Sequence, residues 1–220
     1  YLNLYHQNRS LSTSLVSHQY LAKSHSPREA RRVRFRRVFQ ESRLISLSMT
    51  KSPSILIAGA GPVGLSLALA LARRGLPVRV RESQPGLGNE ARASTWHPPT
   101  LEMMHAWGVA EAIIARGFRV DRLQYWERET RTRVAEFDYA RIAGDTPFPF
   151  RLQCPQSAVT PIMLEALRGT GLADMRFDHT LTGFEAGPDG VVATFDTPAG
   201  PRTETSNYLV GADGARSAVR

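Results

Sequence analysis

Residues 55–82 read ILIAGAGPVGLSLALALARRGLPVRVRE, and this stretch decides the fold. A short apolar run typical of a buried parallel strand leads into a G-x-G-x-x-G pattern. The helix-forming residues that follow are apolar all round, as in a helix buried against a sheet, and Gly75 is placed to end that helix. Residues 77–82 read as a second strand that ends in an acid. This order of elements predicts a Rossmann-like βαβ unit in an α/β fold.

The glycines of this unit have separate physical roles in binding a dinucleotide. Gly59 permits the tight turn out of the strand, Gly61 lets a pyrophosphate approach the backbone, and Gly64 lets helix and strand pack closely. The helix that begins here offers free N–H groups and a positive dipole end to the phosphates. Pro62 and Val63 lie within the same turn and are assigned to the same site.

Glu82 ends the second strand, 23 residues after Gly59. Its carboxylate can accept hydrogen bonds from the hydroxyls of an adenosine ribose, and an acid here argues against the 2′-phosphate of NADP. The fingerprint alone leaves FAD and NAD open. A glycine turn beside a core helix would not account for Glu82, so dinucleotide binding is the favoured interpretation.

Three segments together resemble the FAD-dependent aromatic hydroxylases, the single-component flavin monooxygenases typified by p-hydroxybenzoate and phenol hydroxylases. They are residues 59–65 (GAGPVGL), 92–102 (RASTWHPPTLE) and 208–220 (YLVGADGARSAVR). The resemblance covers about residues 54–220. It implies FAD as cofactor, NAD(P)H as reductant, and a small aromatic molecule as the substrate that is hydroxylated.

The resemblance also assigns residues outside the glycine turn. Arg92 would contact FAD after the second strand, in agreement with the ability of a loop cation to pair with a pyrophosphate. Gln156 matches an FAD-contacting glutamine at the start of a helix. Ala158 departs from the family pattern, which commonly has an acid there.

The last residues of the chain match a second family motif. The resemblance gives Asp213 and Gly214 a role in binding both the FAD pyrophosphate and NAD(P)H, with Arg216 and Arg220 nearby to meet phosphate. A further Gly-Asp motif for the flavin side is expected downstream of Arg220, so the fold is predicted to be truncated at its C-terminus. We therefore assign no catalytic residue and expect this chain alone neither to hold FAD tightly nor to hydroxylate. A non-catalytic FAD- or NAD-binding module, or a pseudoenzyme, remains the alternative.

Two regions between the motifs show strand patterns. Residues 191–195 and 204–210 alternate well enough for a hairpin, and flavoproteins of this type insert such a β-meander before the second motif. Residues 122–137 alternate in part around a turn at 129–131, which predicts a hairpin. We expect residues 118–152 to supply the first part of a substrate-domain β-sheet.

Of the net charge of +8, a leader, residues 1–48, carries +7, with eight Arg and one Lys against two Glu. Three interpretations of the leader compete: a mitochondrial presequence, a nucleic-acid-binding arm, or a non-native upstream segment before a start at Met49. The last is favoured, and disorder is expected in each case. Residues 49–220, the incomplete FAD-binding domain, are then nearly neutral, so no nucleic-acid partner is expected. Location would be cytoplasmic with a start at Met49 and mitochondrial with a presequence.

Several other features favour structural interpretations. Residues 54–72 carry no charge, but their central glycines would break a membrane-spanning helix, so no transmembrane segment is expected. The single cysteine, Cys154, reads as a small buried side chain. Three histidines lack metal-site spacing and are taken as structural: His97, His105 and His179. Three aromatic residues are expected to pack in the core or to line a substrate-domain wall: Trp107, Tyr125 and Trp126.

Overall fold

The computed structural model describes residues 3–5, 54–89 and 93–220. Arg92 and the leader apart from residues 3–5 lie outside the described part of the chain. The predicted βαβ unit is confirmed as β2 (Ile55–Ala58), α2 (Pro62–Ala72) and β3 (Val78–Arg81). The helix begins three residues earlier than the run from Leu65 indicated, because Pro62 suits the first position of a helix.

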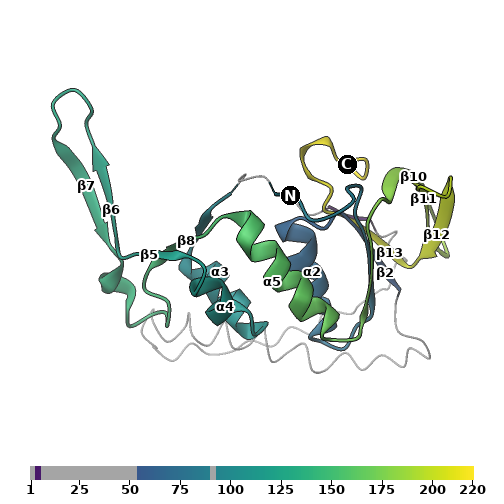
Figure 1. Cartoon of the computed structure of the whole chain (residues 1–220), viewed down its shortest axis with the longest axis horizontal. Helices are drawn as coiled ribbons and strands as arrows, with labels where there is room; N and C mark the ends of the chain where they lie inside the picture. The colour runs from purple at the N-terminus through teal and green to yellow at the C-terminus, as the bar shows by residue number, and fades with distance from the viewer. Residues whose placement is uncertain (1–2, 6–53, 90–92) are drawn as a thin grey trace, which may run out of the picture. The chain divides into compact units, whose positions relative to one another are not determined.

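The unit belongs to a five-stranded sheet of order β1-β13-β2-β3-β9, of which Figure 1 labels β2 and β13. Its other strands are β1 (Asn3–Tyr5), β9 (Ala173–Arg176) and β13 (Tyr208–Gly211). Strands β13, β2, β3 and β9 run parallel, and Gly211, Ala58, Arg81 and Arg176 are aligned at their carboxyl ends. One edge of the sheet therefore gathers the residues that follow three of these strands, as in other open α/β folds that bind nucleotides.

Strand β1 corrects one expectation. Residues 3–5 pair antiparallel with β13, from Asn3 opposite Gly211 to Tyr5 opposite Leu209. The prediction that the whole leader is disordered is wrong for these three residues, which satisfy backbone groups along the outer side of β13. Residues 6–48 lie outside the described part of the chain.

Helices and a second sheet cover the two faces of the central sheet. On one face α2 packs beside α5 (Gln156–Arg168), and their buried leucines meet Ile57 and Val80. The shorter helices α3 (Pro98–Ala106) and α4 (Ala110–Ile114) extend this core. On the other face Leu56 and Leu209 pack against Phe195 of a three-stranded meander. Burial of apolar surface on both faces is what a parallel sheet requires.

The meander contains one strand more than the predicted hairpin, and it ends earlier. Its strands are β10 (Thr180–Gly187), β11 (Gly190–Asp196) and β12 (Arg202–Ser206), in that order. The expected single strand over 204–210 is wrong, because the chain changes sheets at Asn207. There the Asn207 side-chain oxygen accepts hydrogen bonds from the Ser54 N–H at 2.9 Å and from the Ser54 hydroxyl at 3.2 Å. Asn207 thus joins the end of the meander to the start of β2.

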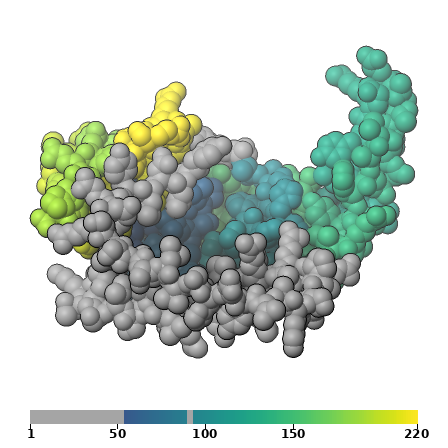
Figure 2. Space-filling view, turned by 180° about the vertical axis from the view of Figure 1, so that it is seen from behind, coloured from purple at the N-terminus to yellow at the C-terminus, as the bar shows by residue number. Residues whose placement is uncertain are grey.

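The middle of the chain forms a small sheet and a hairpin. The small sheet has the order β4-β8-β5, with β4 (Thr95–Trp96), β8 (Arg151–Gln153) and β5 (Phe118–Val120). The hairpin pairs β6 (Arg122–Trp126) with β7 (Arg133–Asp138), and it stands out from the helices in both views (Figure 1, Figure 2). Its turn contains Arg131 at φ 53°, so the predicted hairpin and its tip are confirmed.

Two of the three aromatic residues expected to pack or to line a wall are exposed on this hairpin. Tyr125 is 54% exposed and Trp126 is 57% exposed, so core packing is wrong for both in this chain. Trp107 does pack against the core beside α3. The uncharged stretch 54–72 consists of β2, the glycine turn and α2, and no helix in the described residues is long and apolar enough to cross a membrane.

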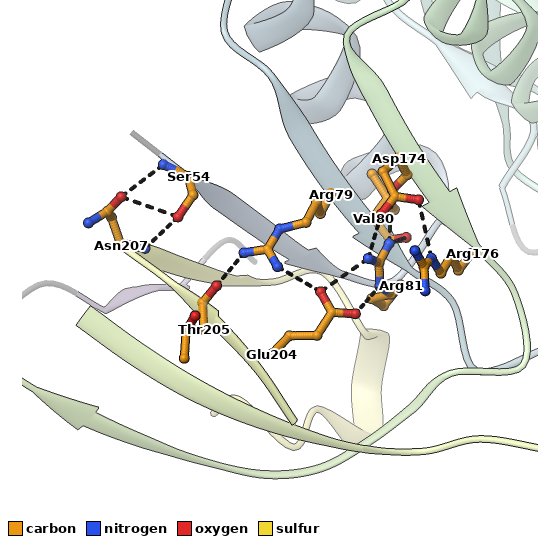
Figure 3. Close-up of polar contacts among 9 residues, drawn as sticks. All are labelled: Ser54, Arg79, Val80, Arg81, Asp174, Arg176, Glu204, Thr205 and Asn207. Carbon is orange, nitrogen blue, oxygen red and sulfur yellow. Dashed lines mark hydrogen bonds and ion pairs between the residues drawn. The ribbon is translucent and has the colours of Figure 1, made fainter. Parts of the chain in front are cut away.

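A buried ion network joins the meander to the central sheet (Figure 3). The Arg81 guanidinium is almost completely buried: Nε donates to Glu204 Oε1 at 2.6 Å, and Nη2 donates to Glu204 Oε2 and Asp174 Oδ2. Nη1 donates to the carbonyl oxygens of Val80 and Asp174. These hydrogen bonds match the five N–H donors of a guanidinium, so the buried charge has both counter-charges and a full set of acceptors.

Asp174 makes folding stability depend on pH. Burial raises the pKa of the Asp174 carboxyl, but Arg81 and Arg176 together outweigh burial and hold that pKa below its usual value. A carboxyl with a lowered pKa in the folded state adds stability above the unfolded-state pKa of about 3.9, and this contribution is lost as the pH falls through the folded-state pKa.

We therefore expect Asp174→Asn to lower the free energy of unfolding at pH 7 and to flatten its decline below about pH 4. Denaturant titrations at several pH values measure both effects. Asp189→Asn, at an exposed turn, is the matched control and should leave the pH profile unchanged. Parallel profiles for wild type and Asp174→Asn would contradict the assignment.

Candidate functional site

The glycine turn sits at the carboxyl end of β2, and its three glycines meet different surroundings. Gly59 has φ +103°, and a Cβ there would lie 2.3 Å from the Ala212 carbonyl oxygen. A Cβ on Gly64 would lie 2.0 Å from the Gly59 carbonyl oxygen. Around Gly61, by contrast, a Cβ would meet no atom of the described residues within 4 Å. Two glycines are thus required by the protein's own packing, and the third borders open space.

The first turn of α2 begins at this open space. Gly61 is the N-cap residue in an extended conformation, with no side-chain hydrogen bond capping the helix, and Pro62 follows it. Val63 is 44% exposed. An uncapped helix N-terminus presents N–H groups and the positive end of the helix dipole, which suits an anion.

Glu82 reaches from the end of β3 to the glycine turn. Its Oε2 accepts the Ala60 N–H at 2.6 Å, while Oε1 accepts the Gln84 N–H and the Ser83 hydroxyl. The sequence indicated a ribose acceptor but not this second role, in which the carboxylate holds the turn in place. Each carboxylate oxygen has two acceptor positions, so Oε2 keeps one beside the turn.

Asp213 lies against the same turn from the other side. The Ala212 N–H donates to the Ala58 carbonyl oxygen at 2.7 Å, which sets the Asp213 segment beside Gly59. Asp213 Oδ2 accepts the Ala218 N–H at 2.7 Å, whereas Oδ1 is buried with no hydrogen-bond partner among the described residues. An unpaired buried carboxylate oxygen is unfavourable on its own and marks a place for a donor. Gly214 follows with φ +81°.

The remaining predicted site residues are placed less closely. Arg216 and Arg220 are exposed side chains in the segment that follows Asp213. Gln156 is the first residue of α5, whose N-terminus faces the carboxyl edge of the sheet because α5 precedes the parallel strand β9. Its side chain makes no hydrogen bond to the glycine turn, Glu82 or Asp213. Arg92 lies outside the described residues.

The donor and acceptor set fits the ADP half of a dinucleotide. Open space at Gly61 and the uncapped start of α2 suit a pyrophosphate, and Glu82 and Asp213 offer acceptors on either side. Segments separated by about 150 residues of sequence therefore form one site, through the parallel pairing of β13, β2 and β3.

The histidines and the cysteine lie elsewhere. His105 Nδ1 contacts Glu111 Oε1 at 2.7 Å on the surface, and His179 Nδ1 donates to the Phe177 carbonyl oxygen. His97 accepts the Leu101 N–H through its carbonyl oxygen at the start of α3. Within the described ranges no three His, Cys, Asp or Glu residues are grouped as metal ligands. Cys154 is buried as predicted, and burial raises the pKa of its thiol, which disfavours the reactive thiolate form.

Comparison with known proteins identifies the family. The family model described as FAD binding domain matches residues 52–220, and the chain belongs to this family. It is 38% identical over 168 residues to 6-methylpretetramide 4-monooxygenase of Streptomyces rimosus, covering 76% of this chain and 30% of that protein. The FAD-binding resemblance predicted from the three sequence segments is confirmed, and with it FAD rather than NAD as the cofactor of the first site.

Solved structures agree in fold. The p-nitrophenol 4-monooxygenase of Pseudomonas putida DLL-E4 has a TM-score of 0.70 at 30% identity, over 78% of this chain and 43% of that one. Aklavinone-11 hydroxylase, solved with FAD and aklavinone, has a TM-score of 0.67 at 33% identity, over 78% and 35%. The chain thus spans less than half the length of the relatives it matches.

Proposed function

We propose that the chain binds the ADP half of FAD and is the FAD-binding part of a flavin-dependent, NAD(P)H-using monooxygenase that hydroxylates an aromatic substrate. The observation that carries the proposal is the meeting of the glycine turn, Glu82 and the unpaired Oδ1 of Asp213 at one edge of the sheet. The printed names of the relatives, which include monooxygenases and hydroxylases of aromatic compounds, support the reaction class.

The pyrophosphate would lie over Gly61 and accept hydrogen bonds from the first turn of α2, next to Pro62 and Val63. Gly59 and Gly64 would shape the turn around the ligand, because their missing side chains make room for the protein's own backbone. The positive end of the α2 dipole stabilises the phosphate charge there.

Glu82 would accept hydrogen bonds from the ribose hydroxyls through the acceptor position that the turn leaves on Oε2. Asp213 would accept, through Oδ1, a hydrogen bond from a hydroxyl or from an ordered water beside the pyrophosphate. Gly214, with its positive φ, lets the chain turn away at that point.

Four side chains complete the proposed site. Arg216 and Arg220 would neutralise phosphate charge from the segment after Asp213, and Arg92 would do so from the loop after β3. Gln156 would donate its amide to the part of FAD that extends past α5. Bound FAD would supply the redox and oxygen-transfer chemistry, and this part of the protein would bind and orient it.

Residues 49–220 would form the FAD-binding domain, with residues 118–152 as the part of a substrate-domain sheet that this chain contains. The exposed aromatic residues of the β6–β7 hairpin agree with a surface that other parts of such a domain adjoin. The substrate class we propose is an aromatic molecule of the kind named in the relatives.

Gly61→Ala tests the ADP site directly. A methyl group at Gly61 meets no atom in the part of the chain that the structure describes, and the residue's φ of −68° suits alanine, so the melting temperature should stay unchanged. The same methyl group would hold the pyrophosphate away from the backbone N–H groups and lower the affinity for ADP by roughly tenfold or more. Isothermal titration calorimetry with ADP measures the affinity.

Gly183→Ala, on the meander strand β10 and also without contacts, is the matched control and should bind ADP like wild type. Failure of the wild-type chain to bind ADP would overturn the proposed function. Equal ADP affinity in wild type and Gly61→Ala would show that the pyrophosphate does not bind at this turn.

A further inference from the structure

Arg81 belongs to the buried ion network and is also in contact with the proposed nucleotide site. Its side chain is bound to Glu204 of β12 and to Asp174 of β9 (Figure 3). Its main-chain oxygen accepts the Gly59 N–H at 2.7 Å, and the next residue, Glu82, accepts the Ala60 N–H. Arg81 therefore connects the meander with one of the two contacts that shape the glycine turn, and it directly precedes Glu82, which makes the other.

We propose that Arg81 is a positioning residue for the nucleotide site: it holds the end of β3 so that the Glu82 carboxylate meets the ribose hydroxyls. This inference rests on the proposed function, because it assigns Glu82 to the ribose of a bound dinucleotide.

The structure gives a reason why the guanidinium serves position rather than packing. Arg81 shares the meander side of the sheet with Leu56 and Ala58, which are buried in an apolar cluster. An apolar side chain would fill such a place without the desolvation penalty of a buried charge. A guanidinium whose five donors all have acceptors is instead confined to one orientation, and its hydrogen bonds run to two different strands.

The backbone alone holds the end of β3 in the plane of the sheet. The Glu82 N–H donates to the Arg176 carbonyl oxygen, and the Glu82 carbonyl oxygen accepts the His179 N–H. These hydrogen bonds resist movement along the sheet but not movement out of it. At the end of β3 Arg81 supplies a restraint in the third direction, because Glu204 belongs to the meander packed on that face; Arg79 binds the same strand of the meander two residues earlier.

The experiment compares two ligands on each variant of the full chain: ADP and 2′,3′-dideoxy-ADP, which lacks the ribose hydroxyls. Wild type should bind ADP about tenfold more tightly or better, since Glu82 makes charged hydrogen bonds to those hydroxyls. In Arg81→Met we expect the ratio of the ADP affinity to the 2′,3′-dideoxy-ADP affinity to fall to within about twofold of unity. A loss of folded protein alone lowers both affinities equally and leaves the ratio unchanged, so the ratio separates positioning from stability.

Arg79→Met is the matched control. Arg79 pairs with the same Glu204 carboxylate at 2.8 Å, from a position two residues earlier on β3, and makes no contact with the glycine turn. The variant should keep the wild-type ratio. If Arg81→Met does not fold, Arg81→Lys takes its place in the experiment. One ammonium group cannot replace the hydrogen bonds to both Glu204 and Asp174, so the affinity ratio of Arg81→Lys should also fall.

A wild-type ratio near unity would reject the proposed contact between Glu82 and the ribose, and with it the basis of the inference. A wild-type ratio of tenfold that persists in folded Arg81→Met or Arg81→Lys would overturn the positioning role alone. A ratio that falls equally in Arg79→Met would assign the effect to the whole network and also overturn the specific role of Arg81.

Discussion

Gly64→Ala is expected to lower the free energy of unfolding by about 3 kcal/mol, because the new methyl group has no room. Its carbon would stand 2.0 Å from the Gly59 carbonyl oxygen and 3.3 Å from the Ala212 side chain. The nearest obstacle is backbone, which cannot rotate away as a side chain would, so α2 must shift away from the start of the turn. Guanidinium chloride titration followed by circular dichroism measures the change.

Gly61→Ala is the natural reference, since it adds the same methyl group three residues earlier and should leave the free energy of unfolding unchanged. The two substitutions therefore separate the two functions of the glycine pattern: Gly64 for packing, Gly61 for the ligand. Equal stability of both variants would mean that the turn can relax around Gly64.

Glu204→Ala is expected to lower the free energy of unfolding by about 3–5 kcal/mol, because it leaves the buried Arg81 guanidinium without its principal counter-charge. Asp174 stays within reach, but its carboxylate is half exposed and cannot replace the hydrogen bond to Nε. The loss should be measurable as a lower melting temperature and denaturation midpoint.

Glu136→Ala removes a glutamate from an exposed ion pair with Arg133 on the hairpin and should change stability by less than about 1 kcal/mol. This contrast tests whether burial, rather than the number of ion pairs, determines the effect. Similar losses in the two variants would show that the network between meander and sheet contributes no more than a surface pair.

The parts of the fold that were predicted correctly are those that local sequence patterns indicate. The apolar run at β2, the glycine turn and the all-apolar helix need only neighbouring residues to be recognised, and the Asp213 motif extended the assignment to the end of the chain. Strand β10 was not anticipated, because a bulge beside Gly183 shifts its register and breaks the alternation along the strand.

Long-range contacts account for what the sequence could not reveal. The alternation V-R-V-R in β3 is typical of a half-exposed strand, yet Arg81 is only 2% exposed because the meander covers that face. Its partner Glu204 is 123 residues away, and no local pattern links the two. The break at Asn207 has the same origin, since the alternation runs on through 204–210 and only the hydrogen bonds to Ser54 mark the change of sheet.

The central position of β2 has a consequence for the order of folding. One neighbour, β3, follows β2 after a single helix, whereas the other, β13, lies far downstream, and the Ser54–Asn207 contacts close a separation of 153 residues. Contacts of such separation form late, because a long loop must close before they contribute. During synthesis one side of β2 therefore stays unpaired until residues 208–211 have been made, and the nucleotide site forms only after β13 has paired with β2. Nucleotide binding can then be used to detect that the chain has reached its native topology.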